Sequence, residues 1–144
     1  MTDQILKDNL YWNLLQVSMR AKHSLIRLAE KHDLSIMQLY TLCSMEAGQP
    51  MPMNSISCFL SCDASNVTGI VDRLLARALI VRQESAVDRR VKMITLTKSG
   101  NDLKQKILAE LQVHQSSTLD GLTTKQKSEL LVLVQAALRQ PEKP

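Results

Sequence analysis

The spacing of apolar residues changes twice along this 144-residue chain, and the two changes restrict its possible folds. Up to Ala78 apolar residues recur at helical spacing. Between Leu79 and Leu96 the period is two, and after Thr97 the helical spacing returns. A period of 3.6 residues indicates amphipathic helices, whereas a period of two indicates strands. We therefore expect a mainly α fold with a small two-stranded β-hairpin.

Six helical segments are expected around the hairpin: about Gln4–Lys31, Ile36–Ala47, Met53–Leu60, Asp63–Leu75, Lys98–Ser116 and Thr124–Leu138. Ser35, Asp63 and Thr97 are expected N-caps. The first helix would be roughly 40 Å long, which exceeds the diameter of a small domain. The last is apolar nearly all round. Both need a second subunit to bury their apolar residues, so a homodimer is expected.

Two opposite faces characterise the helix expected at Asp63–Leu75. One is an apolar stripe at helical spacing, formed by Val67, Ile70, Val71 and Leu74. The other carries short polar side chains and one arginine: Ser65, Asn66, Thr68, Gly69 and Arg73. Short donors and acceptors suit base edges in a DNA major groove, where Asn66 can pair with adenine and Arg73 with guanine or phosphate. A solvated surface helix is the alternative.

Basic residues gather around this helix. Residues 61–104 hold eight Lys or Arg against five acidic residues, which is +3 of the net charge of +4. A phosphate-facing surface needs such an excess. The short helix before Ser61 and the helix after it form a helix-turn-helix, and the hairpin with its Asp88-Arg89-Arg90 tip completes a winged helix-turn-helix.

Other classes of function lack their sequence signals. No Gly-rich phosphate loop, Ser-His-Asp arrangement or metal-ligand spacing is present, so no enzyme, cofactor or metal is expected. The chain has three cysteines, Cys43, Cys58 and Cys62, and no CxxC motif. An odd number of cysteines without such a motif argues against a disulfide framework and against a zinc site. No apolar run approaches the roughly 18 residues of a membrane span. A reducing cytoplasm is the expected compartment.

The segments Asp63–Leu75 and Leu79–Gly100 together resemble the MarR family of winged-helix transcription regulators. The Asp88-Arg89-Arg90 tip and the Leu-Thr-Lys-Ser-Gly run at 96–100 carry the resemblance. It implies a homodimer in which residues 1–34 and 101–144 are dimerisation helices and residues 35–100 form the DNA-binding lobe. Such a dimer would bind a palindromic operator in double-stranded DNA and would commonly repress transcription.

The resemblance also implies roles for single residues. The polar face of Asp63–Leu75 would enter the major groove, and Arg89 and Arg90 would lie on the wing. Arg90 would enter the minor groove, with its guanidinium oriented by Asp88. Family members are commonly released from DNA by small phenolic or lipophilic ligands bound between the dimerisation helices and the lobe. Candidate lining residues are Leu14, Met19, His23, Met37, Tyr40 and Met45, for which core packing is the alternative.

Two other interpretations stay open. One is a winged-helix adaptor that binds protein and no DNA, and the other is a thiol switch that uses Cys58 and Cys62. Three positions depart from the family pattern: Ala78 and Ser61 replace glycines on either side of the DNA-reading helix, and Ser57 replaces a small Ala. Because Ala and Ser tolerate a positive φ poorly, the corner at Ala78 is expected to be rotated or strained.

Overall fold

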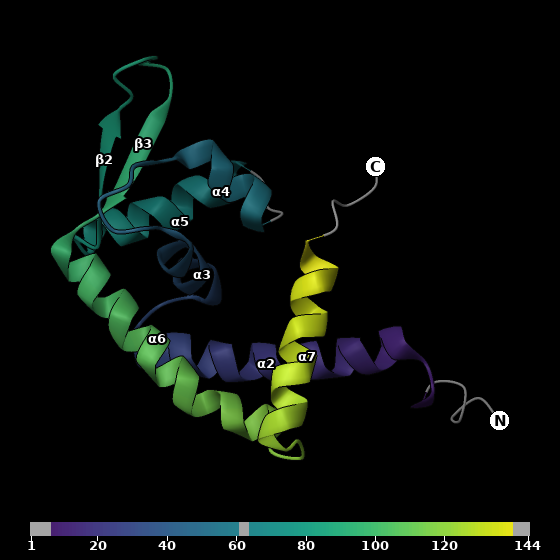
Figure 1. Ribbon diagram of the computed structural model, residues 1–144. Helices are drawn as coiled ribbons and strands as arrows, with labels where there is room; N and C mark the ends of the chain where they lie inside the picture. Colours follow the sequence, from purple (N-terminus) through teal and green to yellow (C-terminus); the bar gives the residue numbers. More distant parts are fainter. Residues whose placement is uncertain (1–6, 61–63, 140–144) are drawn as a thin grey trace.

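A computed structural model describes residues 7–60 and 64–139, with the side chains at 58–60, 64–65 and 114–117 outside that description (Figure 1). The helices are α2 (Leu10–Lys31), α3 (Ile36–Ser44), α4 (Met53–Leu60), α5 (Ala64–Ala76), α6 (Lys98–Leu119) and α7 (Thr124–Leu138). The strands are β1 (Met51–Pro52), β2 (Ile80–Glu84) and β3 (Lys92–Leu96). The expected mainly helical fold with a β wing is confirmed.

Side-chain caps set where most of these helices begin. Ser35 begins α3 with a reciprocal capping box that includes Gln38, and Thr123 begins α7 in the same way with Gln126. The Thr97 hydroxyl accepts from the Gly100 amide, 2.9 Å away, at the start of α6. The expected caps at Ser35 and Thr97 are therefore confirmed. The expected cap at Asp63 and the turn at residues 61 and 62 lie outside the described residues.

The prediction of one unbroken helix from Gln4 is wrong at Asn9. This residue has extended backbone, and its side-chain oxygen accepts from the Trp12 amide at 2.9 Å, so α2 begins at Leu10. Asparagine is a poor helix-interior residue but a strong N-cap. α3 is also shorter than expected, because Met45 has extended backbone and ends the helix at Ser44.

The sheet has one strand more than the sequence pattern predicts. β2 and β3 form the expected antiparallel hairpin, in register from Ile80 opposite Leu96 to Glu84 opposite Lys92. β1 lies antiparallel on the other side of β3, with Met51 opposite Ile94, which gives the strand order β1-β3-β2. The expectation of two strands is thus corrected to three. A two-residue strand containing proline suits a sheet edge, because proline has no amide hydrogen to donate.

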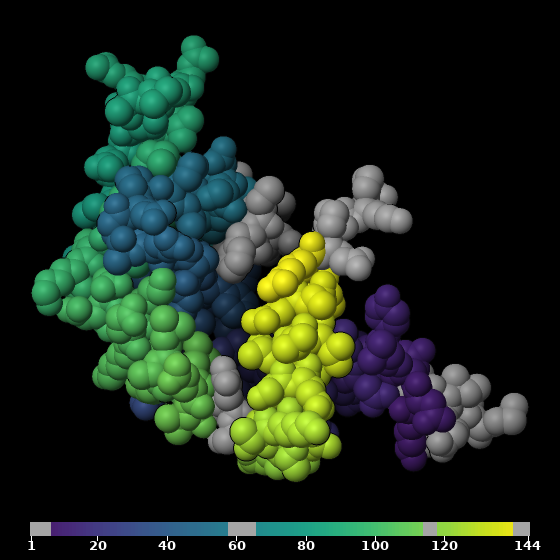
Figure 2. Space-filling view, viewed as in Figure 1, coloured from purple at the N-terminus to yellow at the C-terminus, as the bar shows by residue number. Residues whose placement is uncertain are grey.

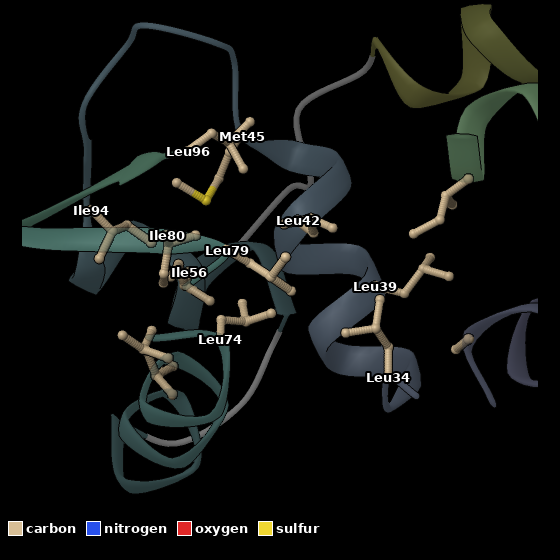
Figure 3. Packing of buried hydrophobic residues seen from close by; sticks show 14 of the residues in the cluster. Leu34, Leu39, Leu42, Met45, Ile56, Leu74, Leu79, Ile80, Ile94 and Leu96 are labelled. Atoms are coloured by element: carbon tan, nitrogen blue, oxygen red, sulfur yellow. The ribbon is translucent and has the colours of Figure 1, made fainter. Parts of the chain in front are cut away.

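One apolar core holds these elements together. Figure 3 shows side chains from α3, α4, α5 and the strands converging, and the largest of them are fully buried: Leu39, Leu42, Met45, Ile56, Leu74, Ile80 and Ile94. Leu28 and Ala29 of α2 and Ile107 of α6 belong to the same cluster. The helix-turn-helix, the wing and the base of the two long helices are therefore packed on a common core.

Much of α2 and α7 lies outside this core. Every described residue from Lys7 to Arg20 is exposed, and α7 contains no buried residue. The exposed apolar side chains of these two helices include Leu10, Tyr11, Leu14, Leu15, Met19, Leu131, Val132, Leu133 and Leu138. Figure 2 shows α7 standing away from the winged-helix region. Within the described residues, no helix combines the length and apolar content that a membrane crossing requires.

Candidate nucleic-acid interface

The α5 helix has the two faces that its sequence predicts. Val67, Val71 and Leu74 are at most 3% exposed and pack into the core. Asn66, Thr68, Gly69 and Arg73 are exposed on the other side. The side chain of Ser65 lies outside the described residues. The polar face of α5 is thus available to a partner, and the apolar face fixes the helix to the lobe.

The end of α5 is a tight corner at Ala78. The Ala78 amide donates to the Leu75 carbonyl at 2.9 Å, and the Leu79 amide donates to the Leu74 carbonyl at 3.0 Å. This is the hydrogen-bond pattern of a Schellman motif, which needs a left-handed residue after the helix. Ala78 occupies that position with φ +53°, so alanine adopts here the conformation that glycine adopts without strain.

The start of α6 supports the same corner. The Thr97 hydroxyl donates to the Ala78 carbonyl at 2.8 Å, and the Thr97 amide donates to the Leu79 carbonyl at 3.1 Å. Gly100 packs so closely against the Leu79 backbone that an added Cβ would be 1.9 Å from the Leu79 carbonyl oxygen. These contacts fix the direction in which β2 leaves α5, and so they place the wing relative to the polar face of α5.

Two exposed ion pairs connect the helix to the wing and the wing strands to each other. An Arg82 Nη1 lies 3.6 Å from an Asp72 Oδ1, which joins β2 to α5. Lys92 Nζ lies 2.8 Å from Glu84 Oε1 across the hairpin. Such exposed pairs contribute little stability. They do restrict the side chains that border the polar face of α5.

The wing tip is ordered by its own hydrogen bonds. The Ser85 hydroxyl accepts from the Val87 amide at 3.2 Å, and Asp88 Oδ1 accepts from the Arg90 amide at 2.9 Å. The Asp88 carboxylate thus holds the backbone of Arg90 and shapes the turn. Its implied role of orienting the Arg90 guanidinium stays a prediction. The side chains of Arg89 and Arg90 are exposed at the tip, and Val87 is 98% exposed. Sequence reasoning does not single out Val87.

A shallow groove of about 320 Å³ separates α5 from the start of α3. It is lined by Ser35, Met37, Gln38, Asn66, Gly69, Ile70 and Arg73. Three expected DNA-contacting residues of α5 therefore border the N-terminal end of α3. Unpaired amides at a helix N-terminus favour negatively charged groups, so this border suits a DNA phosphate.

The six candidate ligand residues are not brought together. Leu14, Met19 and His23 lie exposed on α2, Met37 lines the groove beside α5, and Met45 is fully buried in the core. Tyr40 lines a different pocket of about 450 Å³, together with Cys43, Ser44, Met51, Ser55 and Ile56. The assignment of a ligand site to those six residues stays a prediction.

Cys43 is half-buried in that second pocket. Burial raises the pKa of its thiol, and the nearby Lys104 opposes the shift only in part. A raised pKa keeps the thiol protonated and poorly nucleophilic. The side chain of Cys58 and all of Cys62 lie outside the described residues, so the thiol-switch interpretation stays a prediction. Within the described residues, no three His, Cys, Asp or Glu side chains are grouped as a metal site requires.

Comparison with known proteins assigns the helix-turn-helix and most of the wing to one family. The model of the MarR family matches residues 34–92, which run from the end of α2 through the wing tip into β3. Residues 34–92 of this chain therefore match the MarR family. The resemblance carried by the Asp88-Arg89-Arg90 tip is thereby confirmed.

Alignments with single relatives extend the similarity beyond residues 34–92. The HTH-type transcriptional regulator YkoM of Bacillus subtilis is 27% identical over 130 residues, which cover 87% of this chain and 84% of YkoM. The transcriptional repressor MprA of Escherichia coli is 27% identical over 127 residues, which cover 88% of this chain and 72% of MprA.

Solved MarR-family structures share the fold. Apo MarR of E. coli superposes with a TM-score of 0.79 at 21% identity, covering 90% of this chain and 96% of MarR. A MarR variant from E. coli complexed with operator DNA superposes with a TM-score of 0.74 at 21% identity, covering 90% of this chain and 93% of that chain.

Proposed function

We propose that this chain is a homodimeric, sequence-specific regulator of the MarR family that binds double-stranded DNA and represses transcription. One observation carries the proposal. The exposed polar face of α5 and the exposed arginines of the wing tip are held on one core, where a single duplex can contact both. The similarity to MprA, a transcriptional repressor, and to a MarR structure complexed with operator DNA supports the same assignment.

The proposed mechanism uses two copies of this surface. A dimer places two α5 helices in successive major grooves, roughly 34 Å apart on a palindromic operator. Asn66 would read adenine, and Arg73 would contact guanine or phosphate. Arg90 would enter the narrow, negative minor groove, with Arg89 near the backbone. Asp88 would act through the wing turn by holding the Arg90 amide.

A substitution at the wing tip tests this assignment. We expect Arg90→Ala to weaken operator binding by ~1–3 kcal/mol, measured by electrophoretic titration on a duplex selected by the protein from a random pool. Lys125→Ala, on the exposed surface of α7, removes the same charge far from the wing and should bind like wild type. Equal binding by Arg90→Ala and wild type would exclude the wing from the interface.

The salt dependence of duplex binding distinguishes a DNA-binding protein from the adaptor alternative. A protein that neutralises phosphates releases counterions, so the logarithm of its affinity falls linearly with the logarithm of salt concentration. We expect a steep decline on random duplex. A protein-binding adaptor would give weak binding with little salt dependence. No described residue is proposed to be catalytic. The cytoplasm is the proposed site of action.

We also propose that a small lipophilic or phenolic effector releases the dimer from DNA. In BpsR of Bordetella bronchiseptica, which shares this fold, DNA binding is regulated by 6-hydroxynicotinic acid. A ligand acts as an effector only if it binds the DNA-competent and the DNA-free forms with different affinity. Loss of the operator complex on addition of salicylate, at unchanged salt, would support the proposal.

A further inference from the structure

An arginine at the end of α5 holds the C-terminal end of α2. Arg77 follows α5 directly, and its Nη1 donates to the His32 carbonyl at 3.1 Å and to the Asp33 carbonyl at 2.8 Å. One guanidinium nitrogen thus joins the end of α5 to the end of α2, across more than 40 residues of sequence.

The two carbonyls belong to a second tight corner. The Asp33 amide donates to the Glu30 carbonyl at 3.0 Å, the Leu34 amide donates to the Ala29 carbonyl at 2.9 Å, and Asp33 has φ +54°. α2 therefore ends in the same left-handed motif as α5. Carbonyls at a helix C-terminus carry partial negative charge and lack intrahelical partners, so a fixed cation stabilises them.

α6 holds the same corner from another direction. Lys31 Nζ lies 2.8 Å from Glu110 Oε2, and the buried His32 has its Nε2 3.2 Å from Glu110 Oε1. Residues 31–33 therefore contact both α6, one of the long helices, and the end of α5. The direction of α5 relative to α2 is set at this point.

We propose that Arg77 is a positioning residue for DNA binding, which fixes the angle between α5 and α2 without contacting DNA. The proposal rests on the proposed function. In a dimer joined through α2 and α7, the separation of the two α5 helices depends on that angle at both ends. Loss of the Arg77 contacts allows α5 to rotate, and the two helices then match the half-site spacing less closely.

The test must separate positioning from phosphate binding, since Arg77 is exposed and basic. We expect Arg77→Ala to weaken binding to the selected operator about tenfold. Binding to random duplex and the slope of log affinity against log salt should both stay at wild-type values. The matched control is Arg89→Ala at the wing tip, for which the salt slope should fall by about one.

Operators with altered spacing between the half-sites give a measurement that a general loss of protein stability does not change. The wild type should prefer its selected spacing strongly over duplexes with one base pair inserted or removed between half-sites. In Arg77→Ala that preference should shrink. Arg77→Lys should restore it in part, because a lysine restores the cation at the corner but not the rigid planar geometry of the guanidinium.

Each outcome decides the proposal. A salt slope reduced by about one, with equal losses on operator and random duplex, would make Arg77 a phosphate ligand. An unchanged operator affinity or an unchanged spacing preference would also overturn the positioning role. If Arg77→Ala does not fold, as judged by circular dichroism, Arg77→Lys carries the same test. Absence of salt-dependent duplex binding by the wild type would instead refute the proposed function.

Discussion

Ala78 occupies a backbone position that glycine fills without strain. A left-handed conformation costs a non-glycine residue roughly 1 kcal/mol, although glycine also has more freedom to lose on folding. We expect Ala78→Gly to raise the free energy of unfolding by about 0.5 kcal/mol, measured by urea denaturation. Ala109→Gly, inside α6, should instead lower it by about 1 kcal/mol. A lowered stability in Ala78→Gly would show that the corner relaxes around alanine.

Gly100 and Gly69 should respond to alanine in opposite directions. At Gly100 the new Cβ would meet the backbone oxygen of Leu79, so we expect Gly100→Ala to lower the free energy of unfolding by about 3 kcal/mol. At Gly69, inside α5, no atom lies within 4 Å of the new Cβ. Gly69→Ala should raise stability by about 1 kcal/mol through helix propensity. Equal thermal shifts in the two variants would contradict the close packing at Gly100.

At the scale of elements, the ion pair between α2 and α6 predicts a pH dependence. The Lys31 ammonium, hydrogen-bonded to the Glu110 carboxylate, holds the pKa of Glu110 below its ordinary value of 4.5. A depressed pKa in the folded state contributes stability above the ordinary pKa, which is lost as pH falls through the folded value. Wild type should therefore be more stable than Glu110→Gln well above pH 4.5, with the two converging in acid.

Urea midpoints at a series of pH values and one fixed protein concentration measure this difference. The control is Glu129→Gln in α7, whose partner Lys125 is exposed and 3.9 Å away, and whose midpoint should follow wild type at all pH values. A gap between wild type and Glu110→Gln that persists unchanged in acid would assign the effect to packing and not to charge.

Elements with a local signal are predictable from this sequence. The caps at Ser35 and Thr97 precede clear apolar periods, and the two faces of α5 follow from the spacing of Val67, Val71 and Leu74. Asn9 gives a weaker signal, because apolar residues continue at helical spacing across it. The extent of the polar face and the arginine tip of the wing are predictable for the same reason, since each is a short run of sequence.

Features made by distant segments are not predictable in this way. β1 is two residues long and has no period of its own, and it exists only because β3 offers a free edge. Arg77 binds backbone carbonyls 44 and 45 residues away, and a carbonyl leaves no trace in the residue type. Asp88 is a local case of the same difficulty, because it accepts from the backbone amide of Arg90, and an amide likewise leaves no trace in the residue type.

At the scale of the whole molecule, exposed apolar side chains on α7 predict how the subunits join. Leu133 is 68% exposed and lies in a helix with no buried residue. We expect Leu133→Asp to leave the subunit fold intact and to shift the protein from dimer to monomer in sedimentation equilibrium. Arg89→Asp adds a carboxylate at the wing, away from α7, and should remain dimeric while losing operator binding. A dimeric Leu133→Asp would exclude this part of α7 from the contact.

The exposed apolar residues of α2 and α7 affect how operator occupancy in a cell would depend on the concentration of this protein. If dissociated copies bind a palindrome only after pairing, occupancy climbs with the square of their abundance while that abundance is low. Halving the supply would then cut occupancy about fourfold, by mass action. The helices α2 and α7, which lie outside the DNA-binding lobe, would thereby set the protein concentration at which transcription is repressed.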